Sequence, residues 1–352
     1  MTLFNDFYKG RKVLITGHTG FKGSWLTLWL QRLGADITGV SLEPVTQPNL
    51  FSLAKVKSTC KHYICDIRDT ELFKSIVQEI KPEIIFHLAA QPLVRRSYQQ
   101  PVDTFSTNIM GTVNLLESIR GLKSIKSVVM VTTDKVYRNQ ETLTPYREED
   151  ELGGHDPYSA SKAASELVIA SYRDSFLKEQ GVAISSARAG NVIGGGDWST
   201  DRLIPDAISA WRDKLPLEIR RPESVRPWQH VLDPLFGYMQ LAKKQYGNPE
   251  LAKAYNFGPD ANEAETVRHV ISKVHEIYGS GEIIWHQVPK GPHEAGLLML
   301  NTHKSYLLLD VLSRWNLDVT IKKTARWYLS LHKGANAKAL CEADIEAYEV
   351  AL

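Results

Sequence analysis

A tyrosine and a lysine four residues apart are the first pair in the sequence whose side chains could do chemistry together. In Tyr158-Ser-Ala-Ser-Lys162, both side chains lie on one face if the segment is helical. A neighbouring ammonium favours the phenolate and lowers the pKa of the tyrosine toward the working pH. We therefore expect Tyr158 to take a proton from a hydroxyl group while hydride leaves the same carbon. The spacing also occurs in ordinary surface pairs, so it gains meaning only from its surroundings.

Polar residues at the end of a predicted strand supply those surroundings. Val131-Thr-Thr-Asp-Lys-Val-Tyr137 completes an apolar run and lies where open α/β sheets bind ligands, at the carboxyl end of a parallel strand. Thr133 precedes Tyr158 by 158 − 133 = 25 residues and is placed to hydrogen-bond a substrate oxygen.

A glycine-rich turn near the N-terminus predicts a phosphate site. Gly17-His-Thr-Gly20-Phe-Lys-Gly23 follows the first strand and opens a helix, whose unpaired N–H groups attract phosphates. The spacing is GxxGxxG rather than GxGxxG, and a plain strand-to-helix turn is the alternative. Its position at the first βα junction favours a dinucleotide.

The choice between NAD and NADP depends on the end of the second strand. An acidic residue there would bind the ribose hydroxyls, but the sequence has Val40-Ser41, so Ser41 or Glu43 would have to serve. No arginine follows to neutralise a 2′-phosphate, which favours NAD. Asp66, after the third strand, either contacts the adenine or caps the next turn.

These residues need a scaffold, and the sequence predicts an α/β fold with a Rossmann-type, doubly wound parallel sheet, because short apolar strands alternate with helices. Beyond Asn191, glycines and prolines indicate a smaller, mixed substrate domain. We expect one domain over 1–190, rejoined by about 231–262, and a second over 191–230 and 263–352. The expected strands are 12–16, 35–40, 63–66, 83–88, 128–132, 182–187 and 254–257. The expected helices are 22–33, 70–80, 102–120, 157–178, 265–278 and 321–331.

Composition excludes several other classes of protein. The 352 residues are 43% hydrophobic and 23% charged, as in ordinary globular chains of roughly two domains. A net charge of 42 − 40 = +2 argues against a nucleic-acid binder. We expect no secretory signal and no membrane span. Three cysteines without metal-ligand spacing indicate a reducing cytoplasm and no metal site. Trp25, Trp29 and Trp211 are expected in the core or an interface.

Taken together, the motifs resemble the extended short-chain dehydrogenase/reductases that act on nucleotide sugars, over nearly the whole chain. The Thr133-Asp134 pair before an ionisable residue is similar to the 4,6-dehydratases of that family, of which the commoner members have glutamate where this chain has Lys135. Lys135 and the segments 90–95 and 226–233 are similar to the members that act on CDP-glucose. The other motifs that support the resemblance are Gly17/Gly20/Gly23, His87-Leu-Ala-Ala90, Asn108, Tyr158/Lys162 and Arg188-Ala-Gly-Asn-Val192.

The resemblance implies an NAD-dependent hydro-lyase that forms a 4-keto-6-deoxy sugar in deoxysugar and lipopolysaccharide precursor synthesis. Asp134 would protonate the leaving C6 hydroxyl, and Lys135 would be the C5 base, if burial keeps both neutral. A solvated turn pair is the alternative reading of these two residues. A 4-epimerase and, from another class, a non-catalytic NAD-sensing protein are the alternative functions. The resemblance also implies a homodimer through 102–120 and 157–178, with a tetramer not excluded.

The candidate residues divide into three sets. The catalytic set is Thr133, Asp134, Lys135, Tyr158 and Lys162. The cofactor set is Gly17, Thr19, Gly20, Phe21, Lys22, Gly23, Asp66, Ile67, Leu88, Ala89, Ala90, Gln91, Asn108, Thr132, Tyr158 and Lys162. The substrate set is Gln91, Asn191, Arg202, Arg226, His230, His293 and Glu294, with Arg220 as a weaker candidate.

Overall fold

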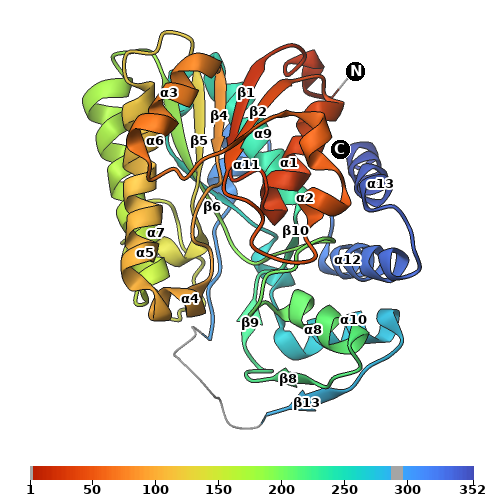
Figure 1. The fold of residues 1–352 in the computed structure, drawn as a ribbon. Coiled ribbons are helices and arrows are strands. Elements are labelled where there is room, and N and C mark those ends of the chain that lie inside the picture. The colour runs from red at the N-terminus through yellow and green to blue at the C-terminus, as the bar shows by residue number, and fades with distance from the viewer. Residues whose placement is uncertain (1–2, 287–295) are drawn as a thin grey trace.

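A computed structural model describes residues 3–286 and 296–352, and its centre is a seven-stranded, wholly parallel sheet (Figure 1). The strand order is β11-β6-β5-β4-β1-β2-β3. The expected Rossmann-type fold is confirmed. The strands are β1 Lys12–Thr16, β2 Asp36–Ser41, β3 Lys61–Ile64, β4 Ile84–His87, β5 Ser127–Val131, β6 Ala183–Ala189 and β11 Ala254–Phe257.

The order of the strands reverses at β1, and this reversal places the site. The chain builds β2 and β3 on one side of β1 and then returns to add β4 on the other side. At such a switch point, the connections leave the sheet in opposite directions and open a crevice at the carboxyl ends of the strands. The glycine turn follows β1 directly, so it lies at this crevice.

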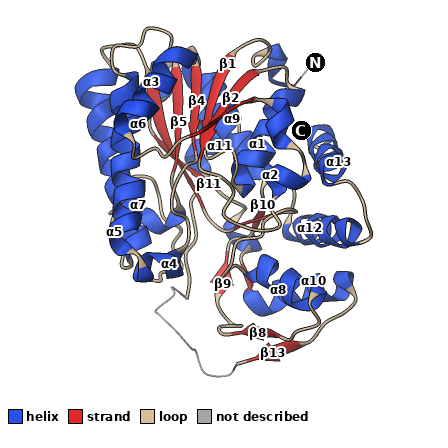
Figure 2. Cartoon of the chain, in the orientation of Figure 1, coloured by secondary structure: helices blue, strands red, loops and turns tan. Residues whose placement is uncertain are grey.

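Helices cover both faces of the sheet, which explains why its central strands β1, β4 and β5 are largely apolar and buried (Figure 2). Leu14 points to one face, and the neighbouring Val13 and Ile15 point to the other. The first face is covered by α3 Thr70–Ile80, α6 Gly111–Ile119 and α7 Pro157–Tyr172. The second is covered by α1 Phe21–Arg32 and α9 Leu232–Tyr246.

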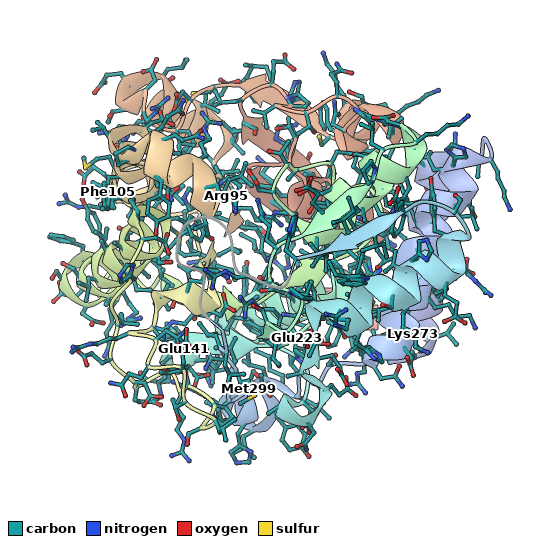
Figure 3. All side chains as sticks on the ribbon, turned by 90° about the horizontal axis from the view of Figure 1, so that it is seen from below. Arg95, Phe105, Glu141, Glu223, Lys273 and Met299 are labelled. Atoms are coloured by element: carbon teal, nitrogen blue, oxygen red, sulfur yellow. The ribbon has the colours of Figure 1, made fainter. Side chains whose placement is uncertain are left out.

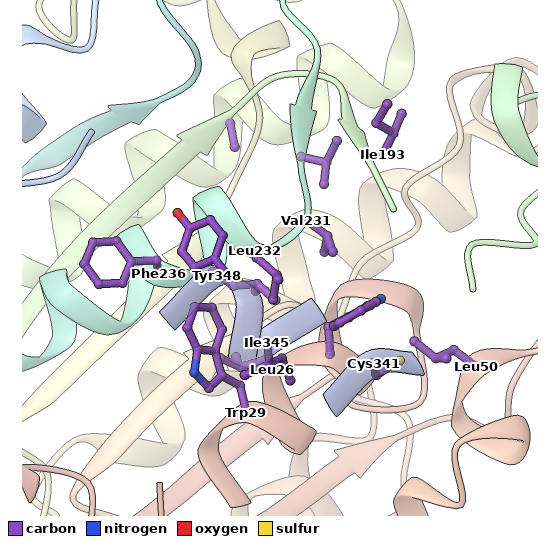
Figure 4. Close-up of a cluster of buried hydrophobic side chains, with 14 of the residues drawn as sticks. Leu26, Trp29, Leu50, Ile193, Val231, Leu232, Phe236, Cys341, Ile345 and Tyr348 are labelled. Carbon is purple, nitrogen blue, oxygen red and sulfur yellow. The ribbon is translucent and has the colours of Figure 1, made fainter. Parts of the chain in front are cut away.

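The three tryptophans expected in the core or an interface lie in the core, two of them on α1. Trp25 and Trp29 are fully buried, and Trp211 is nearly so. Trp29 packs edge-on against Tyr348 of α13, and its indole donates to Glu349 at 2.9 Å (Figure 4). The C-terminal helix α13, Ala337–Val350, therefore lies against the sheet-covering helix α1.

Most of the remaining elements form a smaller region below the sheet in Figure 1. Three short strand pairs organise it: β7 with β10, β9 with β12, and β8 with β13. Their bounds are β7 Val192–Ile193, β8 Leu217–Ile219, β9 Val225–Arg226, β10 Gln229–His230, β12 Glu265–Thr266 and β13 Ile283–Trp285. The helices of this region are α8 Leu203–Arg212, α10 Val267–Tyr278 and α12 Leu317–His332. Helix α11 His303–Leu309 instead packs against α9 and β11 of the main sheet.

Several helices differ from the expected elements. The segment 102–120 is divided into α5 Pro101–Phe105, a π-helical turn Ser106–Met110 and α6. Helix α9 was not expected, because it is buried almost all round and shows no amphipathic period. The short helices α2 Leu50–Leu53 and α4 Val94–Gln99 were likewise not expected, nor were α8, α11 and α13. Among the described helices, none is long and apolar enough to cross a membrane.

Candidate active site

A cavity of about 1110 Å³ opens at the carboxyl ends of the sheet strands and extends toward α8 and β8. Its wall combines the glycine turn, the ends of β2, β4, β5 and β6, the start of α7 and the loop before α8. Figure 3 views the molecule from below and shows Arg95 and Glu141, two residues of this wall, on separate segments.

The glycine turn requires glycine for two steric reasons. Gly17 has φ +77°, and a Cβ there would lie 2.7 Å from the backbone nitrogen of Ala89. A Cβ on Gly23 would collide with the carbonyl oxygen of Gly17. The close packing holds the start of α1 at the cavity wall, where its first N–H groups can face a diphosphate. These residues fit the expected dinucleotide, with Thr19, Phe21 and Lys22 beside them.

Thr19, within the glycine turn, forms hydrogen bonds with the residues at the end of β2. Its hydroxyl lies 2.7 Å from the Ser41 hydroxyl and donates to the Leu42 carbonyl at 2.9 Å. Glu43 lines the same wall. Asp66 lines it too, and its carboxylate accepts from both the backbone and the guanidinium of Arg68. Asp66 thus closes a turn as well as facing the cavity.

Tyr158 and Lys162 lie on α7, which begins at a proline and is capped by Asp156. Both side chains are buried, and Lys162 Nζ donates to the Val131 carbonyl at 3.2 Å. Burial lowers the pKa of Lys162 to about 8, although the Glu166 carboxylate opposes the shift. Burial also raises the pKa of Tyr158 to about 12, while a hydrogen bond with Thr133 lowers it. The low tyrosine pKa expected from the neighbouring Lys162 is therefore not found, because desolvation exceeds the opposing effects of the Thr133 hydrogen bond and the Arg202 charge.

Asp134 and Lys135 are in direct contact just beyond β5. Lys135 Nζ lies 3.5 Å from Asp134 Oδ1, and the Thr133 hydroxyl donates to the same oxygen at 2.9 Å. The side chain of Asp134 is only 3% exposed, but that of Lys135 is 36% exposed. Burial of both groups was expected, and it holds for Asp134 alone, because the Lys135 side chain lies at the cavity.

Three candidates from the sequence lie outside the cavity wall. Gln91 and Asn108 bond to each other: Gln91 N–H donates to Asn108 Oδ1 at 2.8 Å. They shape the loop after β4 and touch no cavity surface. His230 is fully buried between the rings of Trp25 and Trp315, in the core below the site. The pKa of His230 is lowered to about 3 by burial.

The other described candidates of the substrate set line the cavity. Asn191, Arg202 and Arg226 all line the cavity, as does Arg220. Arg202 pairs with Asp197 at 3.4 Å, and Arg226 donates to the carbonyls of Val225 and Gly296. His293 and Glu294 lie outside the described residues. The remaining cofactor candidates on the wall are Gly20, Ile67, Leu88, Ala89, Ala90 and Thr132.

Comparison with known proteins identifies the family. The family model described as GDP-mannose 4,6-dehydratase matches residues 14–287. The chain belongs to this family. The resemblance expected from the glycine turn and from Tyr158 and Lys162 is confirmed.

Relatives of this GDP-mannose 4,6-dehydratase family member include a CDP-glucose 4,6-dehydratase from Salmonella typhimurium, 43% identical over 97% of both chains. A dTDP-glucose 4,6-dehydratase from Haemophilus influenzae is 26% identical over 90% of this chain and 97% of its own. Among solved structures, an epimerase from Methanothermobacter thermautotrophicus has a TM-score of 0.80 at 22% identity, covering 94% of this chain and 97% of its own. An NAD complex of the Bacillus anthracis dTDP-glucose 4,6-dehydratase has a TM-score of 0.76 at 23% identity, covering 92% and 98%. The two structures share the fold.

Sequence reasoning missed several polar contacts of this family member. His18, inside the glycine turn, is buried, and its ring lies 2.7 Å from that of His62 on β3. Arg95 of α4 pairs with Asp201 at 3.4 Å, across the cavity. No sequence signal joins these residues, because they are separated by tens of positions and meet only in the fold.

Proposed function

We propose that the chain is a CDP-glucose 4,6-dehydratase, which converts CDP-D-glucose to CDP-4-dehydro-6-deoxy-D-glucose and water. The observation that carries the proposal is the Asp134–Lys135 contact in one cavity with Tyr158 and Lys162. An epimerase needs only Tyr158 and Lys162, whereas the elimination of water needs an additional acid and base. The 43% identical relative of that name supports the choice of CDP-glucose.

NAD is the proposed cofactor, held by the glycine turn and the ends of β2 and β3. Arg68 lines this end of the cavity, but its charge is balanced by Asp66 and Asp103, each at 2.6 Å. A cation already paired twice is a poor site for the extra phosphate of NADP. When bound, NAD⁺ supplies a hydride acceptor and donor, together with a positive ring charge that favours the Tyr158 phenolate.

In the oxidation step, Tyr158 takes the proton of the C4 hydroxyl, and Thr133 hydrogen-bonds the same oxygen. Lys162 stays protonated beside them at neutral pH, because its pKa of about 8 lies above that pH. The product of the step is a 4-keto sugar, whose carbonyl makes the C5 proton acidic.

In the elimination step, Lys135 takes the C5 proton and Asp134 protonates the departing C6 hydroxyl, which leaves as water. The step requires Asp134 in its acid form and Lys135 as a neutral amine, and their direct contact gives a path along which one proton can pass from the ammonium to the carboxylate. A sugar that covers Lys135 would remove its remaining exposure and favour those forms. Lys135 then returns its proton to C5 as hydride reaches C6.

The proton count closes over one turnover. Tyr158 ends with the proton of the C4 hydroxyl, and Asp134 ends without the proton that left in water. Transfer of one proton from Tyr158 to Asp134 restores the starting state, so the reaction consumes no second substrate.

The substrate diphosphate would lie opposite the sheet, between Arg202 and Arg226, with Asn191 nearby. All three line the cavity, and forked guanidinium groups bind phosphates at two oxygens. Arg226 lies on β9, whose pairing with β12 fixes its backbone. These roles follow from position and charge.

A homodimer, or a tetramer built from two, is the proposed assembly, and the cytoplasm the proposed location. Apolar side chains are exposed on the outer helices, where globular proteins rarely leave them in groups. Val102 on α5 is 80% exposed and Leu167 on α7 is 65% exposed, with Phe105 and Met110 between them in the sequence. The proposed product is a precursor of deoxysugars in lipopolysaccharide.

The discriminating experiment is a product assay on three substrates. The purified protein is incubated with CDP-glucose, dTDP-glucose and UDP-glucose, and the 4-keto-6-deoxy product is measured. We expect product mainly from CDP-glucose. Product only from another nucleotide would overturn the substrate, and a C4 epimer without loss of water would overturn the reaction.

A further inference from the structure

A buried ion pair behind the active site joins the two sets of catalytic candidates. Glu166 on α7 and Arg188 on β6 lie 2.8 Å apart, and each side chain is only 4% exposed. Neither residue lines the cavity. Burying two charges is costly, and apolar residues of the same size are often as stable. The pair therefore needs an explanation other than stability.

Glu166 connects α7 to the start of the segment Thr132–Tyr137. It lies one helical turn beyond Lys162, which itself lies one turn beyond Tyr158. Its Oε1 accepts from the Thr132 hydroxyl at 2.5 Å. Its Oε2 accepts from Ser186 at 2.6 Å and from Arg188. Both oxygens of the Glu166 carboxylate therefore accept hydrogen bonds, which fix the orientation of its side chain.

Arg188 connects the same pair to the other end of that segment. Its Nη1 donates to the Tyr137 hydroxyl at 2.8 Å and to the Glu148 carbonyl at 3.0 Å. Tyr137 in turn donates to Asn256 Oδ1 at 2.7 Å, and Asn256 lies on the neighbouring strand β11. The two ends of a six-residue segment are thus held by the two members of one ion pair.

We propose that Glu166 and Arg188 are a positioning pair, which fixes the segment Thr132–Tyr137 against α7. The segment carries Asp134 and Lys135, and the helix carries Tyr158 and Lys162. The pair would keep the two sets at the spacing at which both act on one bound sugar. The proposal rests on the proposed function, because two successive steps on one sugar are what demand such spacing.

The test removes both charges at once. In Glu166→Gln/Arg188→Met, neither partner is left as an unpaired buried charge, so the chain is expected to fold. Rapid mixing with CDP-glucose then follows bound NADH and released product. Misplacement by about 1 Å can cost about 100-fold in rate. Loss of the Glu166 charge also lowers the pKa of Lys162, so NADH should form more slowly than in the wild type. We expect product release to fall by roughly the 100-fold factor, so that bound NADH still accumulates.

A second measurement needs neither cofactor nor substrate. Hydrogen exchange of the amides of residues 133–137 is compared in the cofactor-free wild type and the double variant. We expect faster exchange in the variant, because the hydrogen bonds at both ends of the segment are altered. This readout still tests the pair if the wild type proves inactive on CDP-glucose, so the two proposals fail separately.

The matched control is Asp344→Asn. Asp344 on α13 forms a partly buried pair with Lys323 of α12 at 2.9 Å, and neither residue lines the cavity. This variant alters a partly buried ion pair remote from the cavity, so it should keep the wild-type ratio of NADH to product and the wild-type exchange of residues 133–137. If the double variant behaves like this control, the proposal is wrong.

A milder variant covers the case in which the double variant does not fold. Glu166→Asp keeps the charge but withdraws the carboxylate by one methylene group. We expect the same accumulation of NADH and the same faster exchange, at smaller amplitude. An unchanged ratio together with unchanged exchange in this variant would also overturn the proposal.

Discussion

Lys135 Nζ lies 3.5 Å from Asp134 Oδ1, one side chain open to the cavity and the other buried. In the proposed reaction, the contact places a base and an acid side by side at the end of β5. A single proton transfer between them changes a charged pair into a neutral one. Because Tyr158 and Lys162 lie on a different element, α7, the two steps of the proposed reaction can be separated by mutation.

Lys135→Met should permit oxidation but block loss of water. Removing one general base typically costs about 10²–10⁴ in rate. We expect little 4-keto-6-deoxy product, accumulation of bound NADH absorbance on adding CDP-glucose, and less solvent deuterium at C5. Turnover near that of the wild type would show that the C5 base is another residue.

Tyr158→Phe should stop the reaction one step earlier. Without the phenolate, the C4 hydroxyl keeps its proton and no hydride leaves. The NADH absorbance that Lys135→Met accumulates should therefore be absent here. Stopped-flow absorbance compares the two variants directly, and an NADH signal of wild-type amplitude would contradict the role of Tyr158.

Gly23→Ala and Gly20→Ala form a matched pair at the glycine turn. A Cβ on Gly23 would collide with the Gly17 carbonyl, whereas one on Gly20 would lie 3.3 Å from the same atom. We expect Gly23→Ala to lose bound dinucleotide and to unfold more easily, by about 1–3 kcal/mol, the usual cost of overpacking. Calorimetry and the dinucleotide released on denaturation measure both. Equal effects of the two substitutions would argue against the steric account.

Lys162→Met should stabilise the ligand-free protein at neutral pH. The pKa of Lys162 is about 8 in the fold and about 10.4 in the unfolded chain, so the unfolded state binds the proton more tightly. Below pH 8 both states are protonated and the wild type carries the full penalty, on the order of 1–3 kcal/mol. The penalty fades as pH rises from about 8 to 10.4, because the fold releases its proton first. Thermal melts at pH 7 and 10 should show the gain shrinking, and a gain that grows with pH would contradict the sign.

Arg226→Ala should weaken substrate binding more than it slows turnover. A diphosphate remote from C4 and C5 is bound alike in the ground and transition states, so its loss raises KM. We expect KM to rise about 10-fold or more, as for loss of a charge-assisted pair. Arg212→Ala is the control, because Arg212 is paired with Asp213 outside the cavity wall. An unchanged KM for Arg226→Ala would remove Arg226 from the diphosphate site.

Local patterns in the sequence were enough to predict the strands of the sheet and to locate the glycine turn. The predicted bounds of β1 and β11 match the structure, since short apolar strands between turns are recognisable without any tertiary information. Tyr158 and Lys162 were found the same way, because helical spacing alone puts them on one face. Family resemblance added Lys135, whose chemistry no periodicity reveals.

Tertiary structure decided which polar residues reach the cavity. His230 and Arg226 lie in one stretch of sequence, yet the first is enclosed by Trp25 and Trp315 in the core and the second lines the cavity. Glu166 and Arg188 are separated by 22 positions and meet only because β6 lies beside β5 under α7. Burial and pairing are set by contacts between distant segments, and such contacts leave no local pattern in the sequence.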